Sequence, residues 1–107
     1  MRLIILTEAG KNIGLGHLSR CSALYEEAIS RGIDCHLFLN GDYEDRGIFF
    51  NVKIDKINWM RRDFINENIS SHDRVIIDSY LTNQKINELI LKIAHKVMFI
   101  DDYGRFD

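Results

Sequence analysis

Two glycines, a histidine and an arginine lie close together near the start of the chain, in a segment that can bind an anion. Residues 12–21 read Asn-Ile-Gly-Leu-Gly-His-Leu-Ser-Arg-Cys. Gly14 and Gly16, with Leu15 between them, allow a sharp turn and a close approach of a ligand to the backbone. The helix expected next offers unpaired N–H groups and the positive end of its dipole. A negatively charged ligand is therefore the first expectation.

His17 and Arg20 lie at the beginning of that helix. The positive end of the helix dipole disfavours a protonated histidine, and a neutral imidazole can take a proton from water or from a hydroxyl group. His17 is therefore the candidate general base, although a capping or purely structural role stays open. Arg20 lies one turn later and can hold a phosphate through two hydrogen bonds, but an arginine on a helix can also be a solvated surface residue.

Short apolar runs alternate with helical patterns along the chain, and this alternation predicts a parallel sheet. The expected strands are residues 2–7, 33–39, 52–57, 74–78 and 96–100. Apolar spacing predicts a helix ending at Gly32 and a weaker helix over residues 59–70 with Asn58 as its cap. It also predicts a third helix before the last strand, whose apolar stripe lies opposite Lys85, Asn87, Glu88 and Lys92. The fold class is therefore α/β, a Rossmann-like three-layer sandwich with a five-stranded, mostly parallel sheet.

Polar residues follow three of the expected strands. Glu8 follows the first strand, Asp78 and Tyr80 follow the fourth, and Asp101 follows the fifth. The carboxyl ends of parallel strands meet at one edge of a sheet, so these groups and the glycine loop should form one site. An aspartate at a strand end can instead accept hydrogen bonds from the next loop, and one of Asp78 and Asp101 is expected to do so.

The composition predicts an ordinary globular domain. The chain has 107 residues, of which 46% are hydrophobic and 28% charged, and its net charge is −2. This charge argues against a nucleic-acid partner, and no apolar run approaches the roughly 18 residues of a membrane span. Because the chain starts with a strand pattern and has no basic signal-peptide front, the cytoplasm is the expected location.

Other features argue against a cofactor, a metal and a disulfide. The glycine loop lacks the third glycine of the dinucleotide motif and the Gly-Lys-Ser/Thr of a P-loop, so no cofactor is expected. Scattered histidines and an isolated Asp101-Asp102 pair predict no metal site. Cys21 and Cys35 lie inside apolar patterns and are expected to be buried thiols.

Three motifs together resemble a known enzyme family. Residues 13–21, followed by an Ala-Leu pair and an Arg-Gly pair, resemble the start of the UDP-sugar hydrolases of pseudaminic acid biosynthesis and of related spore-coat polysaccharide biosynthesis proteins. The sequence Val-Ile-Ile-Asp-Ser-Tyr at residues 75–80 is similar to a family strand that ends in Asp-x-Tyr. The sequence Met-Phe-Ile-Asp-Asp at residues 98–102 is similar to a strand that ends in a double aspartate.

The resemblance implies one Rossmann-like half of a GT-B-type fold, with residues 1–107 as a single N-terminal domain. A C-terminal nucleotide-binding domain, or a partner chain, would complete the cleft. The implied reaction is hydrolysis of a UDP-diacetamido-trideoxy sugar, in which water attacks the anomeric carbon and UDP and the free sugar are released. His17 would deprotonate this water. The residues expected to bind the substrate or its diphosphate are Gly14, Leu15, Gly16, Arg20, Glu8, Asp78, Tyr80 and Asp101.

Two other functions stay open. A glycosyltransferase of polysaccharide synthesis would use His17 on an acceptor hydroxyl instead of water, and its product would be a new glycoside. A non-catalytic binding or subunit module would keep the anion loop and act through a partner chain. This chain alone is expected to turn over little substrate, since catalysis needs both walls of the cleft, and an exposed apolar wall would favour a homodimer.

Overall fold

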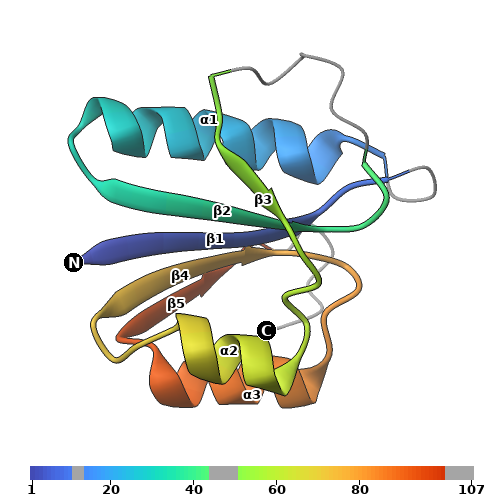
Figure 1. Cartoon of the computed structure of the whole chain (residues 1–107), viewed down its shortest axis with the longest axis vertical. Helices are drawn as coiled ribbons and strands as arrows, with labels where there is room; N and C mark the ends of the chain where they lie inside the picture. Colours follow the sequence, from blue (N-terminus) through green and yellow to red (C-terminus); the bar gives the residue numbers. More distant parts are fainter. Residues whose placement is uncertain (11–13, 44–50, 101–107) are drawn as a thin grey trace.

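Parallel strands form the centre of the molecule (Figure 1). The computed structural model describes residues 1–10, 14–43 and 51–100. Within them the sheet order is β3-β2-β1-β4-β5, and every neighbouring pair is parallel, which confirms the expected α/β fold. The strands are β1 (Arg2–Glu8), β2 (Asp34–Asn40), β3 (Ile54–Lys56), β4 (Asp73–Asp78) and β5 (Lys96–Phe99), and the helices are α1 (Gly16–Ser30), α2 (Arg62–Asn68) and α3 (Gln84–Ile93).

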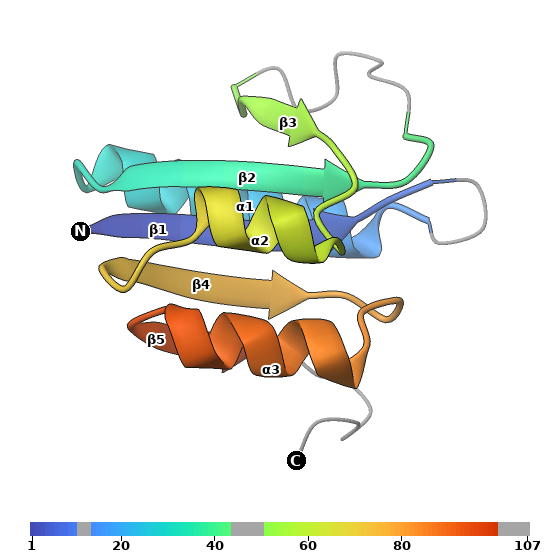
Figure 2. The same ribbon diagram turned by 60° about the horizontal axis from the view of Figure 1, so that its bottom comes forward.

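Helices cover both faces of the sheet, as Figures 1 and 2 show. Helix α1 lies on one face, against β1 and β2, whereas α2 and α3 lie side by side on the other. Successive side chains of a strand point to opposite faces, so Ile5 packs in the core under α1 and Ile4 packs in the core under α2 and α3. Burial on both faces explains why β1 reads as a continuous apolar run. None of the described helices is long and apolar enough to cross a membrane.

Helix α2 begins later than the sequence predicts. It starts at Arg62, and Asn58 does not cap it but accepts a hydrogen bond from the Met60 N–H at 3.0 Å. The reason is Trp59, which is fully buried and donates its indole N–H to the Thr7 carbonyl oxygen at 2.8 Å. The segment before α2 therefore stays non-helical and delivers the indole to β1.

Helix α3 differs from expectation at one position. The apolar spacing places Asn87 on its solvent face, but Asn87 is buried and its side-chain oxygen accepts a hydrogen bond from the Thr82 hydroxyl at 2.8 Å. That bond satisfies the buried amide oxygen. Both cysteines, Cys21 and Cys35, are buried free thiols, as predicted.

The loops after β1 and β2 touch at Gly41. The Ala9 N–H donates to the Asn40 carbonyl oxygen at 3.1 Å, which continues the strand pairing beyond β1. Gly41 has a φ of +124°, and a Cβ added to it would lie 2.0 Å from the Ala9 carbonyl oxygen. A side chain at this position would therefore strain the backbone and separate the two loops.

Replacing Gly41 by alanine should lower the free energy of unfolding by about 3 kcal/mol, because φ strain and a backbone clash act together. The matched control is Gly32→Ala, where φ is +74° and the added Cβ meets nothing within 4 Å, so only the strain of about 1 kcal/mol remains. Urea unfolding followed by the fluorescence of Trp59, the single tryptophan, measures both. Equal losses in the two variants would contradict this account.

An ion pair ties the opposite edge of the sheet together. The Arg2 guanidinium donates to Asp73 Oδ1 at 3.0 Å and Oδ2 at 2.8 Å, and to the Asn68 carbonyl oxygen at 2.7 Å. The Ser70 N–H donates to the same carboxylate at 2.8 Å. Burial disfavours the charged form of Asp73, but the hydrogen bonds from Arg2 and Ser70 outweigh it and lower the pKa of the carboxyl group.

The Asp73→Asn variant should lose about 1–3 kcal/mol of unfolding free energy at pH 7, because Arg2 loses its charged acceptor. A lowered pKa in the folded state means that this stabilisation is present above the ordinary pKa near 4 and is lost as the pH falls through the folded value. The difference between the two proteins should therefore shrink from pH 5 to pH 2. Glu67→Gln, at an exposed carboxylate, is the control. A difference that does not change with pH would show that Asp73 stabilises the fold without its charge.

Candidate functional site

The candidate site lies where the chain reverses its direction across the sheet. β2 and β3 extend from one side of β1, whereas β4 and β5 extend from the other, and the covering helices change faces at the same place. Ligands of open α/β sheets bind at the carboxyl ends of the strands on either side of such a switch point. In this chain those ends are Glu8 of β1 and Asp78 of β4, and α1 begins beside them.

Three of the predicted residues form one hydrogen-bonded cluster. Asp78 is fully buried, and its Oδ1 lies 2.5 Å from Nδ1 of His17. Arg20 donates from Nη2 to Oδ1 and from Nε to Oδ2, each at 2.8 Å. Sequence analysis expected Arg20 to hold a phosphate, but these two nitrogens hold Asp78. The cluster fixes the start of α1 against the end of β4.

The Asp78 carboxylate is ionised at neutral pH. Burial disfavours its charge, but the hydrogen bonds from Arg20 and His17 and the positive charge of Arg20 prevail, so the pKa of Asp78 is lowered. The thiol of Cys21 lies next to it and donates to Oδ2 at 3.5 Å. Burial, reinforced by the Asp78 charge, raises the pKa of Cys21 to about 12, so this thiol is not a nucleophile at neutral pH.

The hydrogen bond to Asp78 determines which imidazole nitrogen of His17 can accept a proton. An ionised carboxylate only accepts hydrogen bonds, so Nδ1 must carry the proton, and the neutral ring then has its lone pair on Nε2. Nε2 is buried and has no hydrogen-bond partner among the described residues, and His17 as a whole is 5% exposed. The ring of Tyr80 packs edge-on against the imidazole, with 4.3 Å between the centroids. A buried acceptor without a partner is unusual, and a catalytic role is one of the explanations for it.

Among the described residues, no side chain caps the start of α1. Leu15, at the N-cap position, is 42% exposed and makes no side-chain capping bond. Gly14 has a φ of +81° and donates its N–H to the Gly10 carbonyl oxygen at 2.8 Å, so this donor closes the loop. The first N–H groups of a helix have no acceptor within the helix. The Ser19 N–H already donates to the Leu15 carbonyl oxygen at 2.8 Å, so the donors available to an anion are those of Gly16, His17 and Leu18.

Glu8 supports the loop that carries Tyr80. Its carboxylate is fully buried and accepts hydrogen bonds from the Ser79 hydroxyl, from the Tyr80 N–H at 2.9 Å and from the Leu81 N–H at 3.2 Å. The structure thus places Glu8 beneath the loop and in contact with backbone donors. Its direct contact with a substrate stays a prediction.

Sequence reasoning assigned no role to two neighbours of the site. Ser79 holds Glu8, and Thr7 donates its hydroxyl to the Asp78 carbonyl oxygen at 2.9 Å. The signal for both was their position at the ends of β1 and β4, which the strand patterns already made neighbours. Asp101 lies outside the described residues. Within the described part of the chain, no three His, Cys, Asp or Glu side chains are grouped to hold a metal ion.

Comparisons of the chain with family models, with curated proteins and with solved structures gave no match.

The geometry predicts that neutral His17 is the Nδ1–H tautomer, the opposite of the form that free histidine prefers. Long-range ¹H–¹⁵N correlation spectra of the imidazole measure the tautomer directly. His72, exposed in the turn before β4, is the control and should show the usual Nε2–H form. Asp78→Asn should remove the preference at His17 and lower the unfolding free energy by about 3 kcal/mol, because Arg20 loses its carboxylate. An Nε2–H form of His17 in the unaltered chain would contradict the assignment.

Proposed function

We propose that this chain forms the catalytic side of a UDP-sugar hydrolase, in which His17 is the general base and the start of α1 binds the diphosphate. The observation that carries the proposal is the His17–Asp78 pair, whose Nε2 atom is buried and unpartnered among the described residues beside an uncapped helix N-terminus. The motif resemblance supports the same reaction and suggests a UDP-diacetamido-trideoxy sugar as the substrate.

The proposed reaction is a displacement at the anomeric carbon. Nε2 of His17 takes a proton from water while the water oxygen forms a bond to the anomeric carbon. The bond from this carbon to the diphosphate oxygen breaks, and its electron pair leaves with UDP. Asp78 stabilises the imidazolium that forms and keeps the ring oriented through Nδ1. The product is the free sugar.

Other groups at the switch point would stabilise the leaving group. Negative charge grows on the diphosphate as the bond breaks, and oriented N–H donors at a helix N-terminus stabilise such charge without reorganisation. The N–H groups of Gly16, His17 and Leu18 would stabilise this charge. Arg20 keeps Asp78 ionised and adds positive charge to the same edge, and its side chain is 36% exposed.

Tyr80 controls access to the base in this proposal. Because Nε2 is enclosed and the Tyr80 ring contacts the imidazole, substrate and water reach the base only when the ring shifts. The hydrogen bonds from the loop to Glu8 keep the backbone of Tyr80 in place during this movement.

Titration of the ¹⁵N-labelled chain with UDP and with the UDP-sugar tests the binding step. We expect saturable shifts of the Gly16, His17 and Leu18 amide signals, and we expect His17→Gln to retain binding within a few fold. Turnover of the chain together with a C-terminal partner domain, followed as UDP release, should fall by about 10²–10⁴ in His17→Gln, the usual contribution of a general base. His72→Gln is the matched control and should behave like the unaltered chain.

The outcomes separate the three functions. Unchanged turnover in His17→Gln would eliminate His17 as the base. A glycoside product instead of the free sugar would identify a glycosyltransferase. Binding at the α1 N-terminus with no turnover, even together with a C-terminal partner domain, would identify a binding module.

A further inference from the structure

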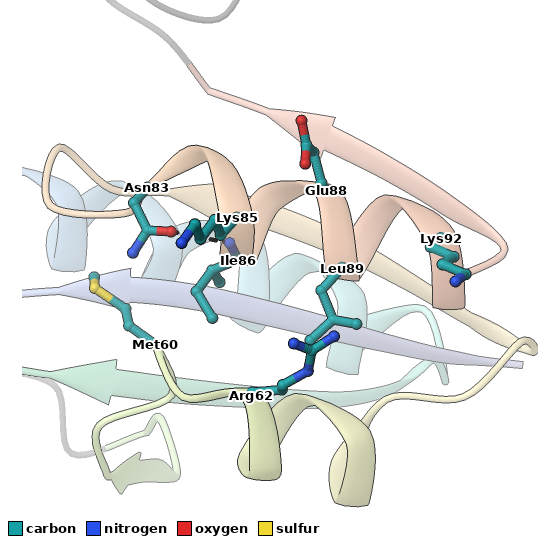
Figure 3. A pocket seen from close by; sticks show the side chains of 8 residues that line it. All are labelled: Met60, Arg62, Asn83, Lys85, Ile86, Glu88, Leu89 and Lys92. Atoms are coloured by element: carbon teal, nitrogen blue, oxygen red, sulfur yellow. Dashed lines mark hydrogen bonds between the residues drawn. The ribbon is translucent and has the colours of Figure 1, made fainter.

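A hollow lies on the face opposite α1, between the start of α2 and the length of α3 (Figure 3). Its volume is about 470 Å³, which falls within the range of about 300–1,000 Å³ that small-molecule sites occupy. Apolar side chains form its floor, and positively charged side chains stand around it. The floor consists of Met60, Ile86 and Leu89, and the cations are Arg62, Lys85 and Lys92. We call this hollow the α2–α3 groove.

The charge of the groove is not neutralised by its surroundings. The side chains of Arg62, Lys85 and Lys92 form no ion pair and no hydrogen bond with any residue that the structure describes. Lys85 and Lys92 are two turns apart on α3, about 10 Å along its axis, and Arg62 extends toward Leu89 from α2 (Figure 3). The one acid of the lining, Glu88, accepts a hydrogen bond from Gln84 at 3.0 Å and points away from α2.

Asn83, the uncharged polar residue of the lining, offers a hydrogen-bond donor to the groove, as the three cations do. Asn83 caps α3 by accepting the Ile86 N–H on Oδ1 at 3.0 Å, so its amide nitrogen is left on the side that faces Met60 (Figure 3). A lining of cations and an amide N–H above an apolar floor recognises a ligand that accepts hydrogen bonds, carries negative charge and has an apolar part. A dianion matches these three cations better than a single carboxylate does.

We propose that the α2–α3 groove is a binding site for a small organic phosphate. The apolar body of the ligand lies on Ile86 and Leu89, and its phosphate lies between Arg62 and the lysines of α3. This site is separate from His17, because α1 and the α2–α3 groove are on opposite faces of the sheet. The inference therefore does not depend on the proposed hydrolase.

Residue-resolved NMR titration tests the site with phenyl phosphate as the probe. Two matched probes are inorganic phosphate, which carries only the negative charge, and phenol, which carries only the aromatic ring. We expect saturable shifts of the Arg62, Ile86 and Leu89 amide signals, with a dissociation constant below about 1 mM and at least tenfold tighter than for either matched probe. The double variant Lys85→Gln/Lys92→Gln should weaken this binding at least tenfold. The control, Lys53→Gln/Lys96→Gln, removes two other exposed lysines and should change nothing.

Several results would overturn the proposal. Equal shifts with inorganic phosphate would show only general attraction of anions to lysines, and unchanged binding in Lys85→Gln/Lys92→Gln would exclude the groove. Absence of shifts at 10 mM phenyl phosphate would exclude the ligand class. Shifts confined to Gly16 and His17 would place the anion at the start of α1 and leave the proposed hydrolase intact, so the two failures are distinguishable.

Discussion

The structure depends on one buried negative charge, the Asp78 carboxylate at the end of β4. A buried carboxylate is tolerated only when hydrogen bonds and opposite charge satisfy it, and removing a partner from such a pair costs about 3–5 kcal/mol. Arg20 and His17, one turn apart on α1, supply these bonds. The charge therefore fixes how α1 is rotated and how far it is shifted along the sheet. The same bonds orient the imidazole, so the stability of this corner and its chemistry have a common cause.

The layout of the sheet could be predicted from sequence because its determinants are local. Runs such as Leu-Ile-Ile-Leu in β1 are apolar on both faces, and only a central parallel strand buries both. The start of α2 could not be predicted in this way, because Trp59 is held by a hydrogen bond to Thr7, far away in the sequence. Asn87 was misplaced for a similar reason, since an amide on a helix looks solvent-exposed until its partner Thr82 is known.

In the candidate site, too, the local sequence predicts some features, whereas contacts between distant residues determine others. The carboxyl-edge topology was sufficient to bring His17 and Asp78 to one corner. Their 2.5 Å contact, and the two hydrogen bonds from Arg20 to Asp78, depend on side-chain directions that spacing does not encode. The residue types indicated which side chains can take part in catalysis. The fold determines which of these side chains hydrogen-bond to one another, and it leaves Nε2 of His17 without a partner among the described residues.

Glu8 has a consequence for how this edge of the sheet could change in evolution. The backbone N–H groups of Tyr80 and Leu81 both donate to its carboxylate. The loop after β4 therefore forms a small nest of N–H donors, of the kind that binds anions, and the Glu8 side chain occupies it. A shorter residue at this position would open the nest to a ligand phosphate or carboxylate and would create a second anion pocket beside His17. One substitution would thus alter which anions fit the corner while the His17–Asp78 pair stays as it is.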